Sequence, residues 1–201
     1  GSLTGMSHGA AGIVLALARA REAGFGGREL HEAVEEGLAF ERRHFRSDVN
    51  TWADLRTGVG DREPMNAWCN GASGIGLARI ATARTGIGPQ DELRRDIEAA
   101  VSRTDSDGRC GVAHPCCGDM GRAELLLEAS FALERPHLRQ RAQAWGAALA
   151  QEGRATGHYQ QFPGMTDTVF SPSFFQGLAG IGYGLLRLEA PEVYPSVLTW
   201  S

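Results

Sequence analysis

The adjacent pair Cys116-Cys117 is the part of this sequence whose residue types point most directly to chemistry. Adjacent cysteines rarely form a disulfide with each other, because the ring that would close over one peptide bond is strained. The pair precedes the expected start of a helix, whose dipole favours the thiolate forms that bind zinc. Cys69 has the matching position one repeat earlier and would supply a third sulfur ligand. Three protein ligands with an open fourth position are typical of catalytic rather than structural zinc sites.

These side chains also have plainer interpretations. Free cysteines often serve as small buried apolar residues, and that alternative stays open for all three thiols. Cys110 lies in a loop outside the repeated pattern, and we interpret it as a bystander thiol. His114 is near enough to Cys116 to compete as a ligand, but Pro115 separates it from the pair, which favours an ordinary loop side chain.

His8 is the candidate for proton transfer. It has the position in its own repeat that Cys117 has in another. An imidazole ordinarily titrates near neutral pH, where it can accept or release a proton during a reaction. Lone histidines are more often hydrogen-bonded polar residues than catalysts, so this assignment depends on the shared position.

The shared position comes from a Gly-x-x-Gly motif that occurs four times, each time before an apolar run with helical spacing. A residue without Cβ at a helix start lets backbones approach closely and permits unusual φ and ψ angles. One copy would be unremarkable in a sequence rich in alanine and glycine, whereas four copies with the same flanking register indicate a repeat. The copies are Ser7-His8-Gly9-Ala10-Ala11-Gly12, Cys69-Asn70-Gly71-Ala72-Ser73-Gly74, Cys116-Cys117-Gly118-Asp119-Met120-Gly121 and Phe175-Gln176-Gly177-Leu178-Ala179-Gly180.

Two kinds of helix alternate along the chain. The glycine-led helices are apolar nearly all round, which demands burial on every side, and the charged helices that follow them are amphipathic and can cover them. Two concentric layers of helices satisfy both patterns, so the sequence predicts an all-α fold, an α/α toroid rather than an open bundle. The expected helices are 9–23, 28–46, 71–83, 90–103, 118–133, 137–151 and 177–188, with a long ordered loop at 47–66.

Composition excludes several classes of partner. The 201 residues fit a single domain, and the net charge of −4 with a pI near 5.9 provides no basic field for nucleic acid or anionic lipid. No apolar stretch is long enough to span a membrane, and no signal peptide is visible. We therefore expect a cytoplasmic location, where cysteines are thiols or metal ligands rather than disulfides. The chain begins directly in a helix-start motif, which suggests a piece of a longer protein.

Four motifs extend the repeats: Gly5-Met6-Ser7-His8-Gly9-Ala10-Ala11-Gly12-Ile13, Trp68-Cys69-Asn70-Gly71-Ala72-Ser73-Gly74-Ile75, Cys116-Cys117-Gly118 and Gly177-Leu178-Ala179-Gly180-Ile181-Gly182-Tyr183. In this order they resemble the motifs of the lanthionine cyclase family. The resemblance is strongest to the C-terminal cyclase domain of the class II lanthipeptide synthetases, and the tail from Leu185 to Leu198 is similar to the natural end of those enzymes.

The resemblance implies an α/α toroid of seven helix pairs, of which residues 1–201 would be the C-terminal part with about four. By motif, Cys69, Cys116 and Cys117 match the zinc ligands, as in the relatives with three cysteines, and His8 matches the active-site histidine. The family's second acid/base residue, an upstream aspartate, has no counterpart here. Asp54 and Asp119 do not match its motif; we interpret Asp54 as a loop residue and Asp119 as a first-turn residue that complements its helix dipole.

The implied reaction is the addition of a peptide cysteine thiol to a dehydroalanine or dehydrobutyrine of the same precursor peptide, which gives a lanthionine or methyllanthionine. The implied partners are this dehydrated peptide and an upstream dehydratase domain of the same polypeptide. Three alternatives stay open: an inert fragment that only binds peptide, a relative that adds glutathione to an electrophile, and a structural zinc domain.

Overall fold

The computed structural model describes residues 2–56, 64–164 and 170–200. Its contacts divide the chain into two compact units, Gly1–Ser106 and Asp107–Ser201.

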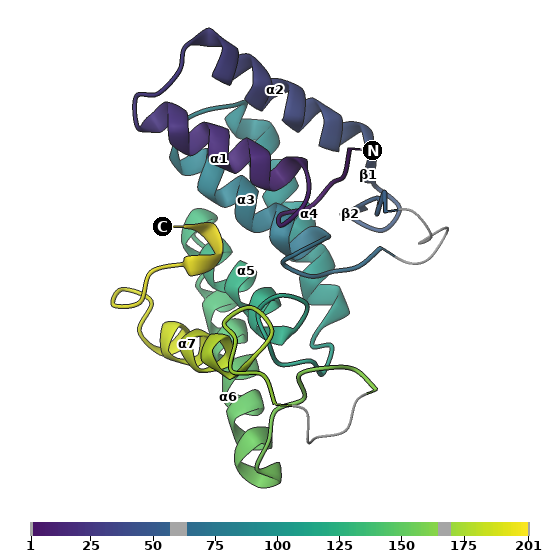
Figure 1. Ribbon diagram of the computed structural model, residues 1–201, viewed down its shortest axis with the longest axis vertical. Helices are drawn as coiled ribbons and strands as arrows, with labels where there is room; N and C mark the ends of the chain where they lie inside the picture. Colours follow the sequence, from purple (N-terminus) through teal and green to yellow (C-terminus); the bar gives the residue numbers. More distant parts are fainter. Residues whose placement is uncertain (1, 57–63, 165–169, 201) are drawn as a thin grey trace. The chain divides into compact units, whose positions relative to one another are not determined.

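In the described residues nearly all regular secondary structure is helical, and the two strands have only two residues each, so the expected all-α class is confirmed (Figure 1). Unit 1 contains the helices α1 (Ala10–Glu22), α2 (Arg28–Arg43), α3 (Ala72–Arg84) and α4 (Gln90–Asp107), the last of which ends one residue beyond the unit. Unit 2 contains α5 (Asp119–Ala132), α6 (Pro136–Thr156), α7 (Leu178–Glu189) and the short 3-10 helix η1 (Val197–Thr199). Among the described residues, none of the helices has the length and apolar character needed to cross a membrane.

The second helix is shorter than its sequence pattern predicts. We expected a helix to residue 46 with Phe45 on its apolar stripe, but α2 ends at Arg43. Phe45–Arg46 instead forms β1, which pairs antiparallel with β2 (Thr51–Trp52). The rings of Phe45 and the buried Trp52 lie 5.0 Å apart, so a cross-strand aromatic contact replaces the last helical turn.

The glycine-led helices begin without side-chain caps. The N-cap residue of α1, α3, α5 and α7 is in each case the first glycine of the motif, which has no side chain to accept a capping hydrogen bond. In three of them the first helical N–H donates instead to a backbone carbonyl seven residues earlier: Ala10 to Leu3 at 2.8 Å, Asp119 to Val112 at 2.7 Å and Leu178 to Ser171 at 2.9 Å. The preceding loop therefore folds back over the helix start and satisfies an N–H that would otherwise lack an intrahelical partner.

This loop explains the glycines of the repeat. A Cβ at each first glycine would collide with the carbonyl oxygen six residues earlier, and three of the four second glycines repeat the same relation. The close backbone approach that glycine permits is therefore made by the loop that leads into the same helix. The distances from that Cβ are 2.6 Å for Gly9 to Leu3, 1.6 Å for Gly71 to Met65, 2.3 Å for Gly118 to Val112, 2.2 Å for Gly177 to Ser171, 2.1 Å for Gly12 to Met6, 1.8 Å for Gly74 to Trp68 and 1.7 Å for Gly180 to Phe174.

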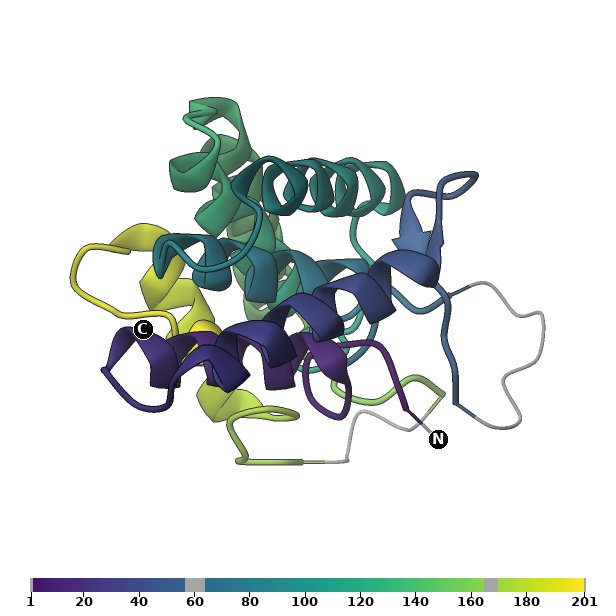
Figure 2. The ribbon, with the colours of Figure 1, turned by 90° about the horizontal axis from the view of Figure 1, so that it is seen from above.

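A buried arginine ties the helices of unit 1 together. Arg79 of α3 is fully buried and donates to Glu41 of α2 at 2.6 Å and to Asp96 of α4 at 2.8 Å. Both views show α2 lying along α1 (Figures 1 and 2). The apolar cluster that joins α1, α2 and α4 consists of Val14, Ala18, Val34, Leu38 and Leu93.

Unit 2 has a comparable buried ion network. Arg187 of α7 donates to Glu124 of α5 at 2.7 Å and also contacts Glu128 and the carbonyl of Tyr194. The hydroxyl of Ser196 donates to Glu124 at 2.5 Å. Burial raises the pKa of Glu124, while the charge of Arg187 opposes that rise. The network therefore holds the C-terminal segment against α5 and α7.

Gly180 and Gly182 allow a matched test of this helix-start constraint, because both lie in α7. We expect Gly180→Ala to lower the free energy of unfolding by about 2 kcal/mol or more, since its Cβ has no space beside the Phe174 carbonyl. Gly182 is exposed with no atom within 4 Å of its Cβ position, so Gly182→Ala should raise the free energy by up to about 1 kcal/mol. Urea denaturation measures both; equal effects would contradict the constraint.

Candidate functional site

The loop that carries Cys69 is anchored by a buried polar network in unit 1. Asn66 accepts the backbone N–H of Ser73 at 3.0 Å and its hydroxyl at 2.6 Å. The Ser73 hydroxyl also lies 3.2 Å from that of Thr104 on α4. Asn66, Ser73 and Thr104 are all buried, whereas the Cys69 that follows Asn66 is half-buried. The network therefore fixes the loop to α3 and α4 and leaves the thiol partly accessible.

The turn that carries His8 is bonded directly to the turn that carries Cys69. The backbone N–H of Ser7 donates to the Cys69 carbonyl at 3.1 Å, and the Ser7 hydroxyl reaches the same oxygen at 3.4 Å. On the other side, the N–H of Gly5 donates to the buried Glu41 at 3.3 Å. Two site residues predicted from sequence, His8 and Cys69, thus occupy adjoining turns of one unit.

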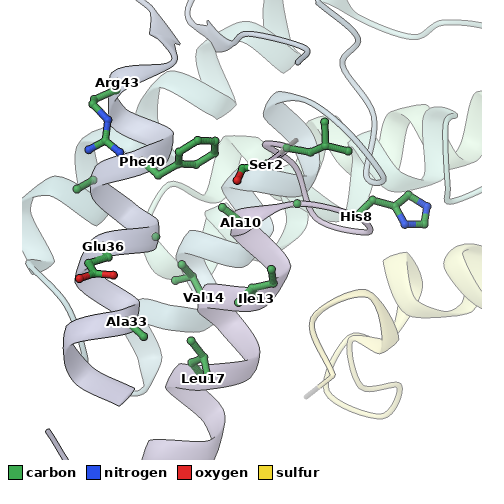
Figure 3. A pocket seen from close by; sticks show the side chains of 14 residues that line it. Ser2, His8, Ala10, Ile13, Val14, Leu17, Ala33, Glu36, Phe40 and Arg43 are labelled. Carbon is green, nitrogen blue, oxygen red and sulfur yellow. The ribbon is translucent and has the colours of Figure 1, made fainter. Parts of the chain in front are cut away.

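His8 is exposed and lies at one end of a groove of about 660 Å³ between α1 and α2. Figure 3 shows its imidazole beside the start of α1, on the side away from α2. The groove is mainly apolar, with Glu36 and Arg43 among its polar lining residues. Its apolar lining includes Ile13, Val14, Leu17, Ala33 and Phe40.

A carboxylate that the sequence analysis treated as an ordinary loop residue lies beside the Cys69 turn. The side chain of Asp54 is only 4% exposed and pairs with Arg56. That hydrogen bond, assisted by one from the Asn70 side chain, holds the pKa of Asp54 below its ordinary value despite burial. No spacing rule could have predicted this position, because Asp54 follows β2 in an irregular loop.

In unit 2, Cys116 and Cys117 present their sulfurs together at the start of α5. Both are half-buried, and their Sγ atoms lie 3.5 Å apart. Two thiolates on one tetrahedral zinc, each at about 2.3 Å, would be separated by roughly 3.8 Å. The N–H of Cys116 donates to the carbonyl of Phe175 at 2.9 Å, which joins this turn to the turn before α7. The pair therefore fits a shared metal ion.

Asp119 anchors the loop before the cysteine pair. It is fully buried, and its carboxylate accepts the N–H of Cys110 at 2.6 Å and Nε of Arg109 at 2.9 Å. Arg109 also pairs with Glu152 of α6, and these hydrogen bonds raise its pKa above the ordinary value. The sequence placed Asp119 in a helix first turn, as observed, but its main contacts are to the loop.

His114 is buried rather than an ordinary loop side chain, with only 2% of its surface exposed. Its Nδ1 accepts the backbone N–H of Cys117 at 3.3 Å, and its ring centroid lies 6.0 Å from that of Phe162. Burial lowers the pKa of His114, although the charge of Cys117 opposes that effect. Cys110, by contrast, is exposed, with Sγ 3.8 Å from the Cys117 carbonyl.

Comparison with known proteins agrees with the repeat pattern. The family model described as "Lanthionine synthetase C-like protein" matches residues 1–199. The structure of a protein named "Nisin cyclase" matches with a TM-score of 0.67 at 19% sequence identity, over 99% of this chain and 48% of that one. The chain therefore spans about half of that structure, whose α/α toroid fold confirms the expected architecture. No curated protein matches the sequence.

Removing the Asp119 carboxylate should release the loop before the cysteine pair. We expect Asp119→Ala to lower the free energy of unfolding by about 2–4 kcal/mol, because it leaves the Arg109 guanidinium and the Cys110 N–H without their buried acceptor. Asp48→Ala, which removes an exposed partner of Arg46, should change it little. Chemical denaturation and hydrogen exchange at the Cys110 amide measure the effect; unchanged exchange in Asp119→Ala would contradict this role.

Proposed function

This chain belongs to the lanthionine synthetase C-like family, and from that premise we propose that residues 1–201 are the C-terminal part of a zinc-dependent lanthipeptide cyclase. Its substrate would be a dehydrated precursor peptide, in which a cysteine thiol adds to a dehydroalanine or dehydrobutyrine. An upstream dehydratase domain in the same polypeptide and a cytoplasmic location remain predictions.

The observation that carries the proposal is the joined pair of turns in unit 1. The bonds from Ser7 to the Cys69 carbonyl hold the His8 turn against the Cys69 turn. A residue able to transfer protons is therefore held near a residue able to bind a metal, without any contribution from outside the unit. That combination suits an addition in which a thiol loses a proton and a carbon gains one.

We propose that Cys69, Cys116 and Cys117 would hold the zinc. Each of the three is a half-buried cysteine at the start of a glycine-led helix, and thiolate sulfur is a ligand that zinc prefers. The 3.5 Å separation of the Cys116 and Cys117 sulfurs supports this donor set. A bound zinc ion would supply Lewis acidity that lowers the pKa of a substrate thiol.

The chain's own residues would then direct the addition. The substrate thiolate attacks the β-carbon of the dehydro-residue, a carbon–sulfur bond forms, and the electrons of the double bond move toward the α-carbon and its carbonyl. His8 would deliver a proton to the α-carbon from its exposed imidazole, and it would be reloaded by the proton that the thiol released. The peptide neither gains nor loses atoms in this reaction, because the ring-closed product is an isomer of the dehydrated peptide.

Zinc content tests the donor set. We expect about one zinc per chain, and Cys69→Ala, Cys116→Ala and Cys117→Ala should each weaken zinc binding about a hundredfold, because each removes one of a few ligands that share the binding energy. Cys110→Ala is the matched control, since this exposed cysteine lies in the same loop outside the repeat. Competition with a chelating dye measures affinity; full affinity in Cys69→Ala would exclude this donor set.

Ring formation tests the role of His8. His8→Asn should slow cyclisation of a dehydrated, cysteine-containing peptide by about 10²–10⁴-fold while zinc content stays constant, because proton transfer is lost and the donor set is kept. His31→Asn, on the exposed surface of α2, is the control. Mass spectrometry after alkylation of free thiols counts rings. Zinc binding without rings in the unmodified chain would instead favour a peptide-binding module.

A further inference from the structure

The side chain of His114 is directed at the backbone of the turn that carries the cysteine pair. Its Nδ1 accepts the backbone N–H of Cys117 at 3.3 Å. The imidazole is almost fully buried, and the Phe162 ring lies beside it. The N–H of the preceding residue, Ala113, donates to the carbonyl of Gln160 at 2.8 Å. This hydrogen bond attaches the backbone next to His114 to the segment that carries Phe162.

The next repeat uses the same hydrogen bond with a different side chain. Ser173 has the position before Gly177 that His114 has before Gly118, and its hydroxyl accepts the N–H of Gln176 at 3.3 Å. Gln176 corresponds in register to Cys117. Gly5 and Ala67 have this position in the first two repeats and offer no side-chain acceptor, so the bond is not a requirement of the turn. Where it occurs without a following metal ligand, its acceptor is a small exposed hydroxyl.

The contrast between the two turns indicates what the imidazole adds. A hydroxyl on an exposed serine can rotate, whereas the buried imidazole is fixed by its surroundings and can hold the amide in one orientation. Fixing the amide of Cys117 limits the backbone rotation that would move its Sγ relative to that of Cys116. The sulfurs lie 3.5 Å apart, a separation that any change in this backbone rotation or in the two χ1 angles would alter.

We infer that His114 is a positioning residue that sets the Cys117 thiol for metal binding through the Cys117 backbone amide, without being a ligand itself. The inference rests on the proposed function, because it assumes that Cys117 binds the metal. Groups that orient metal ligands from outside typically contribute 10–100-fold to metal affinity.

The test uses the complete chain and measures affinity for zinc and the absorption spectrum of the cobalt(II)-substituted protein. We expect His114→Leu, which fills space but has no acceptor, to weaken zinc binding 10–100-fold and to alter the thiolate-to-cobalt absorption. His114→Asn should restore both to near the unmodified values, because its amide oxygen can accept the same N–H. Ser173→Ala, which removes the corresponding bond in the next turn, should change neither.

Each other outcome overturns the inference. His114→Leu with unchanged affinity would show that the hydrogen bond does not position the thiol. Failure of His114→Asn to rescue, or an equal loss in Ser173→Ala, would attribute the effect to general loss of packing. Cys117→Ala separates the two proposals: if it loses zinc while His114→Leu keeps it, only the positioning role fails, and if it keeps zinc, the donor set fails as well.

Discussion

The approach of a loop carbonyl to a glycine at the helix start is the interaction on which both units depend. In each repeat the carbonyl oxygen six residues before the first glycine lies where a Cβ would be. In α1, α5 and α7 the adjoining helical N–H donates a hydrogen bond to that same carbonyl oxygen. The cost of any side chain at this point is steric rather than conformational, although Gly71 also has a φ of +105°. The two residues before the glycine are thereby held at the helix end.

Buried charges connect these helix starts to the rest of each unit. Glu41 receives both the fully buried Arg79 and the N–H of Gly5, so an ion pair between α2 and α3 also holds the loop that leads to His8. Arg187 has an equivalent place in unit 2, where it joins α5, α7 and the C-terminal segment. Such pairs are costly to break, because loss of one partner leaves an uncompensated charge in the interior.

The helices could be predicted closely, because apolar periodicity and glycine or proline breaks are properties of local sequence. The repeat assigned His8 and Cys69 to equivalent helix starts, whereas the hydrogen bonds that join their two turns are a finding of the structure. The loops could not be predicted in the same way. The strands β1 and β2 have only two residues each, too few for a periodic signal. Asp54 and His114 lie in irregular segments, where burial and partners depend on contacts that spacing does not encode. The carbonyl that excludes a Cβ was missed for the same reason.

The main-chain capping of these helices has a consequence for how the family can change. At many helix starts the N-cap residue is a serine, threonine, aspartate or asparagine, whose side-chain oxygen accepts an N–H of the first turn. In α1, α5 and α7 the backbone of the preceding loop accepts that N–H, so the two side chains before the glycine are not needed for capping. Ser-His, Cys-Asn, Cys-Cys and Phe-Gln all occur at this one place in a single chain. Such a scaffold lets new reactivity arise by point substitution while the framework itself is left intact.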